Sequence, residues 1–214
     1  MFSPEFELVL KLGSGILWTL TYIILIRLGF KEKTFGMPIA ALSANIAWEF
    51  IFSFVFPHGK PQIFINYAWF AFDLVIVYQA FRYGKPHFQK LLPKNFFYPT
   101  LIGSLILGFL LVYGITVEFD NFVGGYAAFG QNLMMSILFV VMLLRRGDVS
   151  GQSIYAAIFK MVGTIMPSLL FFGRDQSSLL MNTLYLSIFA FDGVYVWLLY
   201  AKHKELEINA WRRF

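Results

Sequence analysis

Residues 98–117 read YPTLIGSLILGFLLVYGITV, a stretch of 20 residues without a charged side chain. An α-helix needs about 20 apolar residues to cross the hydrocarbon core of a bilayer, so this stretch predicts a transmembrane helix. The whole chain has the same character, since 58% of its 214 residues are hydrophobic and only 14% are charged. A soluble globular protein carries roughly a quarter charged residues. The composition therefore excludes a soluble enzyme and predicts a small polytopic membrane protein.

Six further apolar stretches of similar length alternate with short polar connectors. The predicted spans are residues 8–30, 35–56, 63–83, 98–117, 123–144, 154–173 and 178–201. Helices are expected to stop near prolines, and five prolines fall in connectors or at span edges: Pro57, Pro61, Pro86, Pro93 and Pro99. No repeat, linker or low-complexity segment divides the chain. The sequence thus predicts one all-α, polytopic membrane domain over residues 1–214, a seven-transmembrane-helix bundle.

Basic residues are distributed unevenly between the two sides of this bundle. Thirteen lie on one side: Arg27, Lys31, Lys33, Arg82, Lys85, Lys90, Lys94, Arg145, Arg146, Lys202, Lys204, Arg212 and Arg213. The other side has two, Lys60 and Arg174, beside five acidic residues: Glu5, Glu7, Glu118, Asp120 and Asp175. Lys11 and Lys160 lie near span ends and do not bear on this comparison. Because cytoplasmic connectors are enriched in Lys and Arg, the pattern predicts an N-terminus outside and a cytoplasmic C-terminus, and it explains the net charge of +5 without a nucleic-acid partner.

Three carboxylic acids fall inside predicted spans: Glu49 in the second, Asp73 in the third and Asp192 in the seventh. An ionisable group at such depth costs several kcal/mol and is functional by default. Lys160 is the only deep basic residue, and its long side chain can extend to the membrane surface. A buried carboxyl without a partner keeps its proton near neutral pH. We therefore expect Brønsted acids inside an apolar chamber.

Each acid shares a helical face with other polar or aromatic side chains. The faces are Asn45, Glu49 and Ser53; Asn66, Trp69 and Asp73; and Asn182, Tyr185, Phe189 and Asp192. The fifth span adds Gln131, Asn132 and Ser136. In lipid such faces turn toward the bundle interior. A single polar residue there commonly just hydrogen-bonds a neighbouring helix, and this alternative stays open for Asn45, Gln131, Asn132 and Asn182.

Aromatic residues surround the acid of the third span: Trp69, Phe70, Phe72, Tyr78 and Phe81. Aromatic faces stabilise cations, most strongly where water is excluded. An acid together with an aromatic lining is what a carbocation cascade requires. The chain has no Cys, and its three His residues fall in polar connectors, so the sequence predicts no cofactor and no metal site within the spans.

These motifs resemble the integral-membrane terpene cyclases of meroterpenoid and indole-diterpene biosynthesis, the pyripyropene-type cyclases. The most specific pieces are NIAWEF at 45–50, GQNLMMSILF at 130–139 and a Gly-Gln-Ser loop at 151–153, followed by Lys160, Gly163, Thr164 and Asp192. The resemblance covers essentially the whole chain. It implies that Glu49 and Asp192 are the two essential acids. It also implies that the substrate is a prenyl chain carried on an aromatic, polyketide or indole group, commonly after terminal epoxidation.

The function predicted from the sequence is a metal-independent, proton-initiated cyclisation of such a prenyl chain. Glu49 and Asp192 are the expected catalytic residues, and the expected substrate-binding residues are Asn45, Trp69, Asp73, Gln131, Asn132 and Tyr185. We expect the second, third and seventh spans to face one aromatic-lined cavity that contains both Glu49 and Asp192. The expected partners are a lipophilic prenylated small molecule and membrane lipids.

Two other functions fit parts of the pattern. A small proton-coupled transporter also places carboxylates in mid-membrane, but the chain shows no two-fold repeat, and Pro167 in the sixth span has no counterpart. A non-catalytic sensor or assembly protein would not need three unpaired acids. We expect a multi-pass integral membrane protein, located in a bacterial cytoplasmic membrane or a eukaryotic endoplasmic reticulum membrane.

Overall fold

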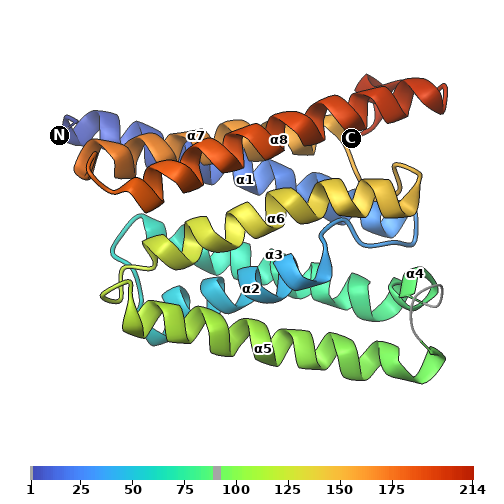
Figure 1. The fold of residues 1–214 in the computed structure, drawn as a ribbon, viewed down its shortest axis with the longest axis horizontal. Helices are drawn as coiled ribbons and strands as arrows, with labels where there is room; N and C mark the ends of the chain where they lie inside the picture. The colour runs from blue at the N-terminus through green and yellow to red at the C-terminus, as the bar shows by residue number, and fades with distance from the viewer. Residues whose placement is uncertain (1, 89–92) are drawn as a thin grey trace.

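The computed structural model describes residues 2–88 and 93–214, and over these ranges the chain is a bundle of α-helices (Figure 1). The long helices are α1 (Pro4–Lys31), α2 (Ile39–Phe50), α3 (Gln62–Tyr83), α5 (Phe97–Glu118), α6 (Gly125–Arg146), α7 (Ile154–Arg174) and α8 (Leu179–Glu205). A π-helix, Ile51–Val55, continues α2, and α4 (Lys85–Phe88) is a single turn. Two 3₁₀ turns cover Lys94–Phe96 and Ala210–Arg212.

Six of the described helices are long and apolar enough to cross a membrane, and the seventh apolar helix, Ile39–Val55, is shorter. The predicted second span at 35–56 is therefore too long. Its first turn does not form because Pro38 is the N-cap residue and residues 32–38 make an irregular connection from α1. At about 1.5 Å per residue the remaining helix is about 26 Å long, slightly less than the hydrocarbon core.

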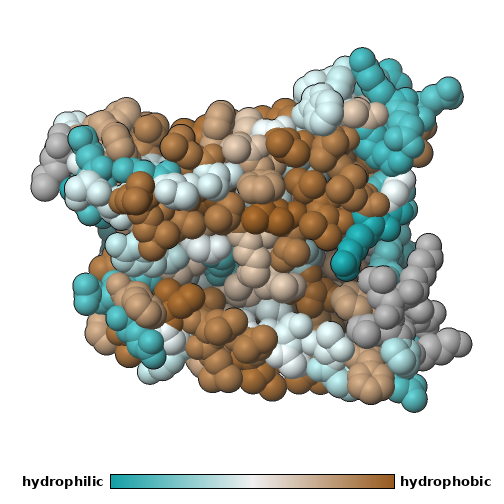
Figure 2. All heavy atoms as spheres, in the orientation of Figure 1, coloured by the Kyte–Doolittle hydropathy of each residue, from teal (hydrophilic) through white to brown (hydrophobic). Residues whose placement is uncertain are grey.

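The connectors alternate between the two ends of the bundle, and the termini lie at opposite ends (Figure 1). The N-terminal end carries residue 2 and the connectors after Val55, Glu118 and Arg174, whereas the C-terminal end carries the other connectors and the chain's last residues. The predicted basic connectors all belong to the C-terminal end, except that Lys90 lies outside the described residues. Figure 2 shows a largely hydrophobic face between hydrophilic ends, as a membrane protein requires.

The helices pack closely where small residues or freed carbonyls allow it. Gly108 of α5 lies against α2, and a Cβ there would be 2.7 Å from the Ser43 backbone. In α7, Pro167 has no N–H to donate to the carbonyl of Gly163. Ser14 of α1 takes that place and donates its hydroxyl to the Gly163 carbonyl at 2.8 Å. The contact ties α1 to α7 beside the cavity described below.

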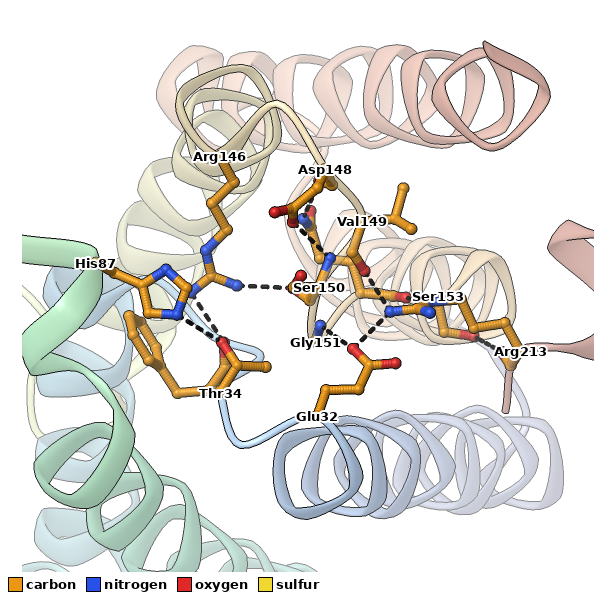
Figure 3. Close-up of polar contacts among 12 residues, drawn as sticks. Glu32, Thr34, His87, Arg146, Asp148, Val149, Ser150, Gly151, Ser153 and Arg213 are labelled. Carbon is orange, nitrogen blue, oxygen red and sulfur yellow. Dashed lines mark hydrogen bonds and ion pairs between the residues drawn. The ribbon is translucent and has the colours of Figure 1, made fainter. Parts of the chain in front are cut away.

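A polar network fastens the C-terminal tail to the connectors at the same end (Figure 3). Arg213 donates to the carboxylate of Glu32 at 2.6 Å and to the carbonyls of Val149 and Gln152 at 2.7 and 2.9 Å. Ser153 in turn donates its hydroxyl to the Arg213 carbonyl at 2.6 Å. The Gly-Gln-Ser loop at 151–153 thus holds this end of the bundle together.

Candidate functional site

A cavity of about 420 Å³ lies within the half of the bundle nearer the N-terminal end. The described residues that line it come from α1, α2, α3, α6 and α7 and from the two connectors around residues 58–61 and 123–124. Because the exposed residues Lys60 and Arg174 are among them, the cavity opens at the N-terminal end. Its volume is within the range of pockets for small organic ligands.

Glu49 lines this cavity from the last turn of α2 and is only 3% exposed. Its Oε2 atom is buried and has no hydrogen-bond partner in the described part of the chain. The ionisable group that interacts with it electrostatically is another carboxyl, Asp73. A buried carboxyl without a cationic partner is most stable in its neutral form. Glu49 therefore presents to the cavity a carboxyl group that can hold a proton, and its catalytic role stays a prediction.

The residues around Glu49 form a polar floor to the cavity. Asn45, one helical turn away on α2, donates to Tyr22 Oη of α1 and to Asp73 Oδ2 of α3, the latter at 2.7 Å. Asn45 and Tyr22 line the cavity. Asp73 is fully buried behind them and is not among the lining residues. Asp73 thus contacts a lining residue, Asn45, without lining the cavity itself, and its role in substrate binding stays a prediction.

Three tryptophans give the cavity an aromatic wall: Trp18, Trp48 and Trp69. Hydrogen bonds orient two of them, since Trp48 donates to the Gly124 carbonyl at 3.0 Å and Trp69 donates to the Thr19 hydroxyl at 3.2 Å. Trp18 and Trp69 are neighbours, with ring centroids 6.3 Å apart. Rings fixed in this way can stabilise a positive charge that passes over them.

Of the aromatic residues predicted around Asp73, only Trp69 lines the cavity. Phe70 packs on Phe50 and Phe54, and Tyr78 is exposed beside Phe30. The prediction is wrong for these residues because successive positions of an α-helix point about 100° apart, so a continuous aromatic run cannot face one side. The other aromatic lining residues belong to α1, α2, α6 and α7: Trp18, Tyr22, Trp48, Phe129 and Phe171.

Gln131 and Asn132 of α6 line the opposite wall, as their prediction as substrate-binding residues requires. Asn132 donates to the Thr164 hydroxyl at 3.1 Å. The side-chain carbonyl oxygens of both residues are buried without a hydrogen-bond partner in the described part of the chain. Unpaired acceptors of this kind are costly, so a ligand in the cavity is a natural partner for them.

Asp192 does not share the cavity with Glu49, contrary to the expectation. It forms an ion pair with Lys160 of α7, at 2.7 and 2.9 Å from the lysine Nζ to the two carboxylate oxygens. Lys160 also donates to the Ser136 hydroxyl at 2.8 Å. Both charged side chains are 2% exposed. Lys160 therefore turns inward instead of extending to the surface, because a carboxylate and a hydroxyl there satisfy its ammonium group.

The described residues that line the cavity include none from α8, so the seventh span does not face it. The ion pair nevertheless lies close by, because Lys160 Nζ is 5.7 Å from the ring centroid of Trp18, a lining residue. Tyr185, predicted to bind substrate, is also one layer away, and its ring packs edge-on against the lining residue Phe129 at 4.8 Å. The catalytic role of Asp192 and the binding role of Tyr185 remain predictions.

The connectors at the N-terminal end shape the opening of the cavity. His58 lines it, stacks on Phe52 with centroids 4.5 Å apart, and lies 3.1 Å from both Asn66 Nδ2 and the Val123 carbonyl. Burial lowers the pKa of His58, so its neutral form is favoured; a proton on Nε2 then donates to Val123 while Nδ1 accepts from Asn66.

Asp120 shapes the other connector by accepting from the backbone N–H groups of Tyr126 and Ala127 at the start of α6. Burial raises the pKa of this carboxyl, although the backbone hydrogen bonds oppose the effect. Gly124, the residue before α6, has φ of +78° and lines the cavity. The capped, left-handed turn thus carries part of the cavity wall.

Sequence reasoning missed three groups of cavity residues. Trp18 and Tyr22 are one helical turn apart on α1, which is a signal for a shared face, and Trp48 directly precedes Glu49. The cations Lys11, Lys60 and Arg174 also line the cavity. Lys60 and Arg174 were visible in the sequence as the two exceptions to the charge asymmetry.

Comparison with known proteins finds one matching family model and several similar proteins. A family model described as "Pyr4-like transmembrane terpene cyclases" matches residues 5–204. The Pyr4-family terpene cyclase mfmH of Annulohypoxylon moriforme is 30% identical over 165 residues, covering 75% of this chain and 68% of the relative. Asnovolin H synthase nvfL of Aspergillus novofumigatus is 30% identical over 165 residues (73% of this chain, 65% of the relative).

A third relative, the terpene cyclase pyr4 of Aspergillus fumigatus, is 26% identical over 171 residues, which are 77% of this chain and 69% of the relative. The chain thus aligns with between 65% and 69% of the length of these three proteins. No solved structure matches the chain.

Proposed function

Because the chain belongs to the family of Pyr4-like transmembrane terpene cyclases, we propose that it catalyses the proton-initiated cyclisation of a linear prenyl chain on a meroterpenoid-type substrate. The observation that carries the proposal is Glu49, a buried carboxyl with an unpartnered oxygen in the wall of an aromatic cavity. Family membership favours this function over the proton-coupled transporter, which shares only the buried acids.

In the proposed reaction, Glu49 transfers its proton to the terminal epoxide oxygen or terminal olefin of the substrate. The neighbouring double bonds then attack in turn, and each ring closure moves the positive charge along the chain. A base removes a proton from the last cation. The product is an isomer of the substrate, because one proton is added and one is lost and no electron leaves the molecule.

The cavity residues have distinct parts in this proposal. Trp18, Trp48 and Trp69 stabilise the moving positive charge, and the cavity shape holds the chain near its reactive conformation. Asn45, fixed by Asp73 and Tyr22, keeps the floor beside Glu49 rigid. Asp192 supports the site as a positioning residue, since it holds Lys160 behind Trp18.

The proposed setting is a membrane with the N-terminal end outside and the C-terminal end in the cytoplasm, because the basic connectors gather at the C-terminal end. The three relatives compared above are fungal proteins. Of the two membranes predicted from the sequence, we therefore propose the endoplasmic reticulum, where the cytoplasmic side retains this charge bias. A lipophilic substrate enters from the bilayer or through the opening at the N-terminal end.

The test is turnover of prenylated aromatic substrates, with and without a terminal epoxide, by the purified protein in lipid nanodiscs. Glu49→Gln keeps the size and hydrogen-bonding groups of the side chain but removes the acid, so we expect turnover to fall at least about 100-fold, as for loss of a general acid. Glu118→Gln is the matched control, because Glu118 is exposed and does not line the cavity. Folded Glu49→Gln protein with near-normal turnover would refute the proposal.

A further inference from the structure

Positive charge at the N-terminal end of the bundle is concentrated around the cavity. This end has three cations, Lys11, Lys60 and Arg174, and all three line the cavity. It also has five acids, Glu5, Glu7, Glu118, Asp120 and Asp175, and none of these described residues is among the lining residues. The two basic residues that depart from the charge asymmetry of the chain, Lys60 and Arg174, thus lie at the cavity opening, together with Lys11.

Glu7 supplies the one described carboxylate that forms ion pairs with any of these three cations. Glu7 is shared by two of them, at 3.0 Å from Arg174 and 3.7 Å from Lys11. Lys60 forms no ion pair with any described carboxylate, and its Nζ lies 5.8 Å from the ring centroid of Phe64. His58 adds no charge, since its neutral form is favoured. Among the described residues that line the cavity, the three cations therefore outnumber the one acid, Glu49.

The three cations lie nearer the opening of the cavity than Glu49, the proposed proton donor. Lys11 and Tyr22, both lining residues, are eleven positions apart on α1, which is about 16 Å along the helix axis. Tyr22 is hydrogen-bonded to Asn45, and Glu49 is one turn, or about 6 Å, back toward the opening. About 10 Å of cavity therefore separates the level of Lys11 from that of Glu49.

We propose that the opening binds an anionic oxygen group, a carboxylate or a phosphate, on the head of the substrate. The inference rests on the proposed function and adds the substrate class and its orientation. A head group held by Lys60, Arg174 and Lys11 directs the prenyl chain inward, so that its far end reaches Glu49. A membrane protein has reason to keep basic residues out of non-cytoplasmic connectors, and recognition of an anion explains why these three are retained.

The test measures the binding of three probes to the purified protein in detergent. Binding is monitored through the quenching of the fluorescence of the cavity tryptophans. The probes are a farnesylated hydroxybenzoic acid, its methyl ester, and farnesyl diphosphate. We expect the two anions to bind more tightly than the neutral ester. The Lys60→Gln/Arg174→Gln variant should weaken anion binding about tenfold, the scale of a charge-assisted hydrogen bond, and leave the affinity for the ester unchanged. Lys204→Gln is the control, because Lys204 lies at the C-terminal end of the bundle, away from the cavity opening.

If the farnesylated hydroxybenzoic acid binds more tightly than farnesyl diphosphate, the anionic head group of the substrate is a carboxylate. If farnesyl diphosphate binds more tightly, the head group is a phosphate. Equal affinity for all three probes, or equal weakening of all three by the double variant, overturns the inference. If the variant does not fold, salt serves instead, since raising ionic strength must weaken the anions selectively. Glu49→Gln should bind every probe normally, so loss of turnover in that variant separates the proposed function from the head-group assignment.

Discussion

The ion pair between Lys160 and Asp192 offers a quantitative test of how the buried acids are used. Both side chains are 2% exposed, and the carboxylate oxygens lie 2.7 and 2.9 Å from the ammonium group. Asp192→Asn removes the negative charge and leaves Lys160 with one hydroxyl partner, Ser136. Breaking a buried pair from one side costs about 3–5 kcal/mol. For a protein of this size, that lowers the melting temperature by roughly 6–20 °C.

Adding Lys160→Met should recover part of the lost stability, because it removes the buried ammonium group that Asp192→Asn leaves without a counter-charge. The measurement is thermal unfolding of the two single variants and the double variant in one detergent, with turnover recorded for each. Asp175→Asn is the control. This exposed acid lies in the connector before α8, and its loss should change stability by less than about 0.5 kcal/mol.

The outcome separates a positioning residue from a catalytic one. If Asp192 acts only by compensating the charge of Lys160, the double variant regains part of the melting temperature and much of its turnover. An unchanged melting temperature in Asp192→Asn would refute the reasoning from the ion pair. A double variant that is folded and stable but inactive would mean that the Asp192 carboxylate or the Lys160 ammonium group does more than balance the charge of the other; the family resemblance implies that the carboxylate is essential.

Two further predictions concern metal and pH. Because protonation starts the proposed reaction, protein treated with EDTA should retain its turnover of a prenylated aromatic substrate; activity that returns only with added Mg²⁺ would contradict the mechanism. Burial lowers the pKa of His58 below its ordinary value of about 6.5, so its neutral form contributes stability that is present above pH 6.5 and lost as pH falls through the lowered pKa. The melting temperature should therefore fall between pH 7 and 5 more steeply for the native chain than for His58→Gln, and parallel curves would show that His58 does not titrate there.

Most of the fold could be predicted from hydropathy, because a helix that crosses lipid must be apolar over its whole length. The uncharged stretch at 98–117 lies within α5, Phe97–Glu118, as expected. The second span shows the limit of the method. Its apolar residues begin before Pro38, but the helix does not, since backbone geometry and not hydropathy decides where a helix starts.

Site residues could be predicted from the sequence where they share one face of a single helix. Asn45 and Glu49 are one turn apart on α2, and both line the cavity. A face does not show which neighbouring helix it meets, however, and this is why Asp192 was expected beside Glu49. Lys160 was misread for a related reason, because a flexible lysine side chain can reach either the surface or an internal partner. Only packing decides between them.

Partners, more than depth in the membrane, distinguish the three buried acids. Asp192 faces the ammonium group of Lys160, which occupies both of its carboxylate oxygens. Asp73 accepts a hydrogen bond from Asn45 at Oδ2, and although its buried Oδ1 has no hydrogen-bond partner among the described residues, Asp73 does not line the cavity. Glu49 has no cation beside it among the described residues, and its unpartnered oxygen lies in the cavity wall. Three acids that look equivalent in the sequence are therefore suited to three tasks: to hold a lysine, to hold an amide, and to give up a proton. Only the last of these tasks requires a substrate, and only Glu49 is placed to meet one.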